Sequence, residues 1–81
     1  MKHSLLELEP GKKAIIERLR GGRTVFSRLI TLGFTPGTAI TVVRNSNHGP
    51  LLVSLRGSQI ALGHGEAAHI LVCLSKKESS I

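Results

Sequence analysis

Residues 32–38, Leu-Gly-Phe-Thr-Pro-Gly-Thr, constrain the fold of this chain more than any other stretch. Gly33 can adopt the left-handed conformation that commonly ends a helix, and Phe34 behind it predicts a hydrophobic contact with the last helical turn. The four residues that follow fit a type II turn, with Pro36 at the second position and Gly37 at the third. The stretch therefore predicts an elbow that converts a helix into a strand.

The hydrophobic period changes across this elbow. Before it, apolar residues in 23–32 recur at spacings of four and three, which indicates one face of a helix formed by Val25, Leu29 and Leu32. After it, residues 38–45 are rich in β-branched side chains and predict a strand. We expect both phenylalanines of the chain, Phe26 and Phe34, to lie in the core.

The remaining apolar segments predict four more short strands, at 12–19, 51–56, 59–62 and 68–74. Residues 4–11 are interpreted as a lead-in that closes with a Pro-Gly turn, and residues 63–67 as a turn or a single helical turn. Gly57 and Ser58 fit a two-residue hairpin turn with glycine first.

Alternation within two of these strands predicts which side chains face the core. Leu51, Val53 and Leu55 should point inward in one of them. Ile70, Val72 and Leu74 should share a face of the last one.

These elements predict a mainly-β domain with five strands and one short helix inserted after the first strand. A chain of 81 residues can bury one small core. A flat sheet of this size would leave long exposed edges, which closure into a barrel removes. We therefore predict a small SH3-like five-stranded barrel over residues 1–75, followed by a polar tail at 76–81.

Composition narrows the possible partners and the compartment. The formal net charge is +6 and aspartate is absent, which suits nucleic acid, an anionic membrane surface or an acidic protein. The basic residues are scattered, however, as on an ordinary solvated surface. We expect the single cysteine, Cys73, to be a small buried hydrophobe. No apolar run is long enough for a transmembrane helix and no signal peptide is recognised, which favours a cytoplasmic protein.

Catalysis is the function class that the residues favour least. The chain contains no phosphate-binding P-loop motif. Most of its five glutamates lie in stretches that look exposed, and neither Cys73 nor any histidine belongs to a nucleophile signature. We predict no catalytic residues and no required cofactor.

One cluster could bind a metal ion. His64, Glu66 and His69 lie within six residues, and imidazole with carboxylate suits Fe²⁺ or Zn²⁺. Spacings of two and three residues match no strong metal-binding motif, so an inert surface pair of histidines is the competing interpretation. His3 and His48 are more isolated.

Two kinds of macromolecular binding remain as hypotheses. Nucleic-acid binding is favoured by charge, but single-strand binding usually needs exposed aromatic rings, and tryptophan and tyrosine are absent. Protein binding would use Arg23 and Arg28 on the helix, the loop at 45–50 and Arg56 near the hairpin, and would suit an acidic partner.

Some outward strand positions look apolar. These are Val43, Leu52 and Leu71. They could form an interface, including one between copies of this chain, or be ordinary exposed apolar surface.

Taken in order, the segments resemble the FeoA family of small SH3-like barrels, which is associated with bacterial ferrous iron uptake. The resemblance is carried by LLELEPGKKAIIERL, RLITLGFTPGTAITVVR and GPLLVSLRGSQIALGHGEAAHILV, which run from about Leu5 to Val72. It implies a cytosolic accessory or regulatory protein of FeoB, the membrane transporter of ferrous iron that carries a cytosolic nucleotide-hydrolysing domain. The same barrel occurs in DtxR-type metal-dependent repressors, but the winged-helix DNA-binding part is absent here, so the repressor role is not implied.

Overall fold

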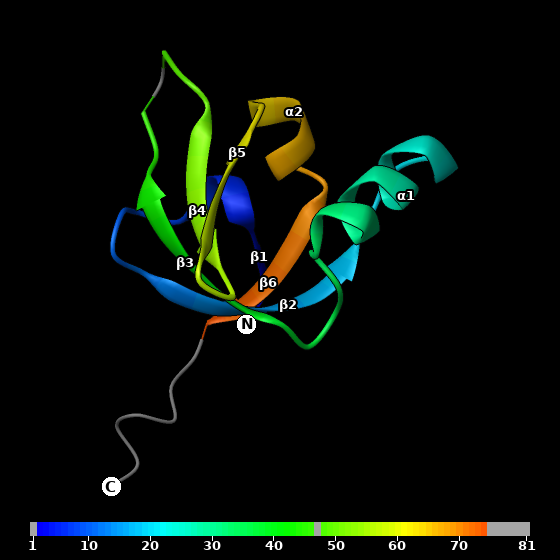
Figure 1. Cartoon of the computed structure of the whole chain (residues 1–81), viewed down its shortest axis with the longest axis horizontal. Coiled ribbons are helices and arrows are strands. Elements are labelled where there is room, and N and C mark those ends of the chain that lie inside the picture. The colour runs from blue at the N-terminus through cyan, green and yellow to red at the C-terminus, as the bar shows by residue number, and fades with distance from the viewer. Residues whose placement is uncertain (1, 47, 75–81) are drawn as a thin grey trace, which may run out of the picture.

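Six antiparallel strands form a single sheet in the order β1-β6-β2-β3-β4-β5 (Figure 1). The computed structural model describes residues 2–46 and 48–74, so the predicted tail at 76–81 lies outside the described residues. The strands are β1 Lys2–Ser4, β2 Lys13–Leu19, β3 Ala39–Arg44, β4 Leu51–Leu55, β5 Ser58–Leu62 and β6 Ile70–Leu74. The helical elements are η1 Leu5–Glu7, a 3-10 turn, α1 Arg23–Leu32 and α2 His64–Ala67. This architecture confirms the predicted mainly-β class with one short helix.

The sheet curls because two of its strands carry irregularities in register. The pairing shifts between Ile16 and Arg18 in β2, and between Val42 and Arg44 in β3. Such bulges bend a strand and increase its twist. Figure 1 shows β2 sweeping across the base of the molecule, so that the strands wrap around one core. The core residues are Leu5, Leu8, Ala14, Ile16, Leu29, Phe34, Ile40, Val42, Leu51, Val53, Leu55, Leu62, Ala67, Ile70 and Val72.

The predicted number of strands, five, was wrong because the sequence gives no signal for β1. Lys-His-Ser has no hydrophobic alternation, and this short strand exists because it pairs antiparallel with β6, with Ser4 opposite Leu71. The helix α1 consequently follows the second strand, not the first. The segment interpreted as a lead-in also supplies two core residues, Leu5 and Leu8.

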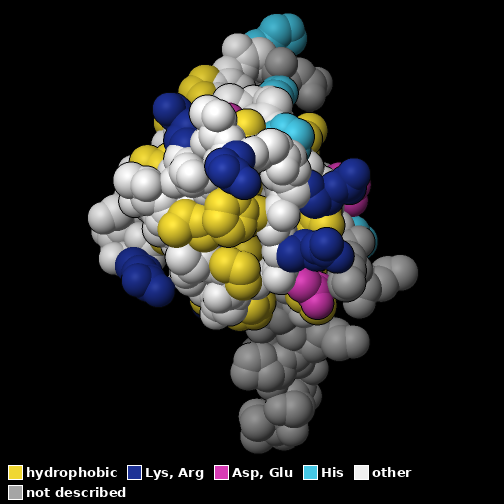
Figure 2. All heavy atoms as spheres, turned by 90° about the vertical axis from the view of Figure 1, so that its right-hand side faces the viewer, with side chains coloured by type: hydrophobic (Ala, Val, Ile, Leu, Met, Phe, Trp, Pro, Cys, Tyr) yellow, Lys and Arg dark blue, Asp and Glu magenta, His cyan; other side chains and the backbone are white. Residues whose placement is uncertain are grey.

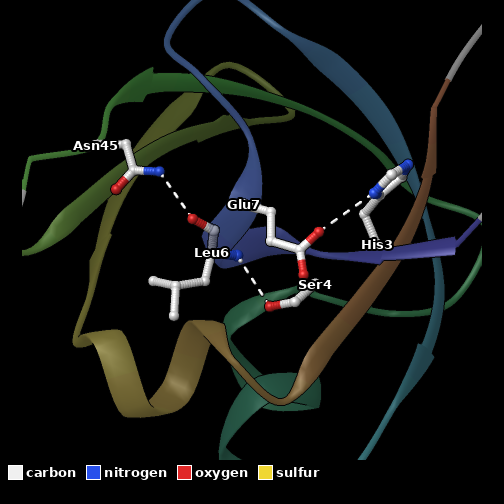
Figure 3. Close-up of polar contacts among 5 residues, drawn as sticks. All are labelled: His3, Ser4, Leu6, Glu7 and Asn45. Carbon is white, nitrogen blue, oxygen red and sulfur yellow. Dashed lines mark hydrogen bonds and ion pairs between the residues drawn. The ribbon is translucent and has the colours of Figure 1, made fainter.

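Asn45 fastens this N-terminal segment to the end of β3. Its Nδ2 donates to the backbone carbonyl oxygen of Leu6 at 3.0 Å, as Figure 3 shows, and to that of Leu8 at 2.7 Å. The Leu6 backbone N–H in turn donates to the Ser4 hydroxyl at 3.1 Å. One amide side chain therefore satisfies two carbonyl groups in a turn that lacks a regular strand partner.

The elbow confirms the prediction made from residues 32–38. Gly33 ends α1 with φ +105° and ψ 4°, and the backbone N–H of Phe34 donates to the Leu29 carbonyl at 2.9 Å. Phe34 is fully buried. In the turn that follows, the Thr38 backbone N–H donates to the Thr35 carbonyl at 3.1 Å, and Gly37 has φ +94°.

The β4–β5 turn differs from its prediction by one residue. Its central residues are Arg56 and Gly57, at φ +52° and +85°, and Leu55 pairs with Ser58 across it. Two positive values define a type I′ turn, where asparagine and glycine are the usual residues. The predicted inward alternation of Leu51, Val53 and Leu55 in β4 is confirmed. The predicted Gly57-Ser58 turn was wrong, because burial of these side chains fixes the register of β4 and β5 even though it places an unfavourable residue in the turn.

The last strand ends at Leu74 as predicted, but it begins at Ile70 and not at residue 68, because Ala68 caps α2. Ile70 and Val72 are fully buried, whereas Leu74 is exposed. Its neighbour Cys73 is only partly buried and forms no disulfide.

Candidate partner-binding surface

The helix α1 rests on the barrel along one narrow stripe. Leu29 is its buried residue, and Val25 and Leu32 pack half-buried against the core beside it. This is the face that the sequence predicts. Figure 1 shows α1 beside the sheet, with its N-terminal end projecting away from the strands.

Phe26 does not lie in the core, as the sequence led us to expect, because its side chain is 46% exposed. Each helical residue turns the side-chain direction by about 100°, so a residue next to Val25 leaves the stripe that faces the sheet. The phenylalanine that lies in the core is Phe34 of the elbow. The chain therefore carries an exposed aromatic ring.

The two arginines of α1 have different surroundings. Arg28 forms an ion pair with Glu66 of α2, which also accepts a hydrogen bond from the backbone N–H of Gly63 at 3.1 Å. Arg23 is exposed and lies one turn before Phe26, on the same flank of the helix. Among residues 2–46 and 48–74, Arg23 has no carboxylate partner.

We define the α1 flank as Arg23, Phe26 and the half-buried Ile30, which follow one another at helical spacing. Figure 2 shows this side of the molecule, where hydrophobic side chains gather and Lys and Arg side chains surround them. Interfaces are enriched in aromatic residues and arginine. The flank thus has the composition of a protein-binding surface.

A second surface lies where the elbow meets the β4–β5 turn. It is an open pocket of about 560 Å³, which we call the elbow pocket, and it is lined by Thr35, Pro36, Gly37, Thr38, Ala39 and Arg56. The Thr35 and Thr38 hydroxyl oxygens lie 2.9 Å apart, and Arg56 Nη2 lies 3.5 Å from Thr38 Oγ1. Sequence reasoning selected Arg56 but missed these hydroxyls, because only the fold brings the two turns together.

The three residues proposed for metal binding have different surroundings. Glu66 pairs with Arg28, and the His69 ring lies so close to Gly21 that a Cβ there would sit 3.0 Å from Nδ1. His64 Nε2 is buried and has no hydrogen-bond partner. Within the described part of the chain, no three His, Cys, Asp or Glu side chains are grouped closely enough to hold a metal ion. The metal site stays a prediction, and this arrangement gives it no support.

The isolated histidines and the outward apolar residues lie apart from both surfaces. His3 Nδ1 lies 3.2 Å from Glu7 Oε1, and His48 is exposed in its loop (Figure 3). Val43 is exposed, and Leu52 and Leu71 are half-buried on their strands. In the ranges that the structure covers, no helix has both the length and the hydrophobicity needed to cross a membrane.

Comparison with known proteins decides the family. A family model described as the FeoA domain matches residues 3–73. The chain belongs to the FeoA family. A relative from Methanocaldococcus jannaschii, named as an Fe(2+) transport protein A, is 37% identical over 62 residues, which are 76% of this chain and 74% of the relative.

Solved structures agree with the FeoA assignment and the SH3-like fold. A crystal structure of an iron uptake regulatory protein, FeoA, matches with a TM-score of 0.84 and 35% identity, covering 89% of this chain and 96% of that one. A manganese-dependent transcriptional repressor in complex with manganese matches with a TM-score of 0.86 and 17% identity, covering 91% of this chain and 37% of the repressor. At that identity the repressor shows the shared fold alone.

Proposed function

We propose that this FeoA-family protein is a non-enzymatic cytosolic accessory module of ferrous iron transport that acts by binding a FeoB-like membrane transporter. The observation that carries the proposal is the FeoA match over residues 3–73, nearly the whole described chain. The relative named as an Fe(2+) transport protein supports the same process. No cofactor is required for a binding role.

The α1 flank supplies a physical basis for partner binding. Fully burying an exposed phenylalanine side chain contributes about 1.5–3 kcal/mol. The Phe26 side chain is 46% exposed, so covering it contributes about half of that. Arg23 beside it would steer an acidic partner toward the flank and reject a basic one. Since α1 packs on the barrel through Val25, Leu29 and Leu32, a partner can contact the exposed Arg23 and Phe26 without disturbing the core.

Both candidate surfaces suit binding better than catalysis. The α1 flank presents the exposed side chains of Arg23 and Phe26, and the elbow pocket is open to solvent. Enzyme sites usually exclude water, because electrostatic stabilisation of a transition state is strongest in a dry environment. Neither surface offers that environment.

The proposal is tested by measuring the affinity of the purified protein for the FeoB-like transporter of the same organism, held in lipid nanodiscs. We expect Phe26→Ala and Arg23→Glu each to weaken binding about tenfold, since each removes about 1.4 kcal/mol of contact energy. Val43→Ala and Arg44→Glu are matched controls, because they change an exposed apolar residue and an exposed arginine on β3.

Two results would contradict the proposal. Failure of the unaltered protein to bind the transporter would remove the accessory role. Equal weakening by Arg44→Glu would show that net charge determines the affinity, and equal weakening by Val43→Ala would show that the contact is not specific to the α1 flank.

The exposed ring of Phe26 also favours the alternative of nucleic-acid binding, because a base could stack on it. Titration with random single-stranded DNA separates the two functions. A nucleic-acid protein would show log affinity falling linearly with log salt concentration, with Phe26→Ala reducing affinity at every salt concentration. We expect no saturable DNA binding at physiological salt.

A further inference from the structure

Arg56 occupies a backbone conformation that disfavours it. Its φ of +52° places it in the left-handed region at the first central position of the β4–β5 turn. Asparagine, aspartate or glycine make this turn more easily, and arginine there costs about 1 kcal/mol. Because other residues would form this turn more easily, we infer that arginine is present for an interaction that its side chain makes.

The Arg56 side chain reaches back over the elbow. Within the described residues 2–46 and 48–74 it makes one hydrogen bond, from Nη2 to Thr38 Oγ1, which is long at 3.5 Å. A guanidinium group has five N–H donors. The ion pairs of the described residues are His3 with Glu7 and Arg28 with Glu66, so no described carboxylate neutralises Arg56.

The two threonine hydroxyls beside it supply a further donor. Thr35 and Thr38 share one hydrogen bond at 2.9 Å, which uses one of their two hydroxyl protons. In the described part of the chain no acceptor takes the other proton, so it can donate to a ligand. Thr38 is 8% exposed, so its hydroxyl is held in place beside the pocket. The pocket therefore combines a cation and a spare hydroxyl, with Pro36 and Ala39 as apolar lining.

We propose that the elbow pocket binds a carboxylate, supplied by a glutamate or aspartate side chain of an acidic protein segment. Arg56 makes paired N–H···O bonds to the two carboxylate oxygens, a geometry that guanidinium favours. A threonine hydroxyl donates to one of them, and Pro36 and Ala39 contact the aliphatic stem. That the acidic segment belongs to the transporter rests on the proposed function, whereas the carboxylate site itself does not.

The geometry favours a carboxylate over a phosphate group. Phosphate sites usually recruit several cations or backbone N–H groups. At the elbow, the backbone N–H of Gly37 already donates to the Ile16 carbonyl at 2.7 Å, and that of Thr38 donates to Thr35. One guanidinium group and one hydroxyl group match the two oxygens of a carboxylate better than the four oxygens of a phosphate group.

The site is tested by nuclear magnetic resonance titration of the ¹⁵N-labelled protein with sodium glutarate at constant ionic strength. Glutaramide, which has the same shape without charge, is the matched ligand control. We expect saturable shifts of the backbone N–H signals of residues 35, 37–39 and 56–58 with glutarate and none with glutaramide. Arg56→Asn keeps a residue that favours the turn and should weaken glutarate binding about tenfold, whereas Arg44→Asn on β3 should leave it unchanged.

Three outcomes would overturn the carboxylate site. They are unchanged glutarate binding in Arg56→Asn, shifts spread over all basic residues, and tighter binding of inorganic phosphate than of glutarate. Transporter binding is a separate readout. If glutarate binds at Arg56 but the transporter does not bind, the site stands and the proposed function fails; if the transporter binds through Phe26 but glutarate does not bind, only the site fails.

Discussion

The elbow after α1 and the turn between β4 and β5 both reverse the chain through left-handed backbone, but they do so with different residues. At the elbow, the two positive φ angles belong to Gly33 and Gly37. At the β4–β5 turn, one of the two belongs to Arg56. In the elbow, both left-handed positions are occupied by glycine, which favours that conformation. In the β4–β5 turn, one left-handed position is occupied by arginine, which disfavours it. Such conflicts concentrate at functional positions, which is why we assign architecture to the elbow and recognition to Arg56.

Even the two elbow glycines are not equivalent. A Cβ built on Gly33 would lie 2.9 Å from Leu55 Cδ2, while one built on Gly37 would meet nothing within 4 Å. Gly33 is therefore required by both conformation and space, and Gly37 by conformation alone. The structure thus separates two glycines to which the sequence assigns the same kind of left-handed conformation.

Gly33→Ala is expected to have the largest effect. The added methyl group would collide with the buried Leu55 and would also strain the left-handed backbone. We expect a loss of about 3 kcal/mol in the free energy of unfolding, combining overpacking with backbone strain. Urea denaturation followed by circular dichroism measures it. A loss below 1 kcal/mol would show that α1 does not end against Leu55 as described.

Gly37→Ala is expected to have an intermediate effect. Its strain is limited to the φ of +94° in the type II turn, so we expect a loss of about 1 kcal/mol. The same denaturation experiment provides the comparison. If this variant is destabilised as much as Gly33→Ala, the difference that we draw between the two glycines is wrong.

Arg56→Asn is expected to have the smallest effect on stability, and with the opposite sign. Relief of left-handed strain outweighs the loss of the long hydrogen bond to Thr38, so the unfolding free energy should rise by about 0.5 kcal/mol. Thermal unfolding without glutarate measures the gain in stability. The same experiment with glutarate shows whether the variant has lost the stabilisation that the ligand gives to the unaltered protein. Destabilisation by 1 kcal/mol or more would mean that Arg56 is there for structure.

The sequence was sufficient where a local signal determines the structure. The bounds of α1 at residues 23–32 follow from a hydrophobic period and from Gly33, and both are local. The strand β1 could not be predicted, because it depends on its pairing with β6. The exposure of Phe26 depends on which face of α1 packs against the core, and that face is formed by Val25, Leu29 and Leu32.

The candidate site was less predictable than the fold. Arg28 and Glu66 are 38 residues apart, and their ion pair depends on how α1 and α2 pack on the barrel. The sequence pointed to Arg56 because of its charge. Its left-handed backbone could not be predicted, because turn preferences place asparagine, aspartate or glycine in that conformation and not arginine. The resemblance to FeoA supplied the partner hypothesis, which charge and periodicity alone leave open.

The central claim is that this protein contacts a FeoB-like transporter through the α1 flank. The most direct test places a photoreactive phenylalanine analogue at position 26 in the native host, and identifies cross-linked proteins by mass spectrometry. A second strain carries the analogue at position 43, on the exposed side of β3. We expect the transporter to be captured from position 26 and not from position 43. Capture of other proteins without the transporter, or equal capture from both positions, would contradict the account.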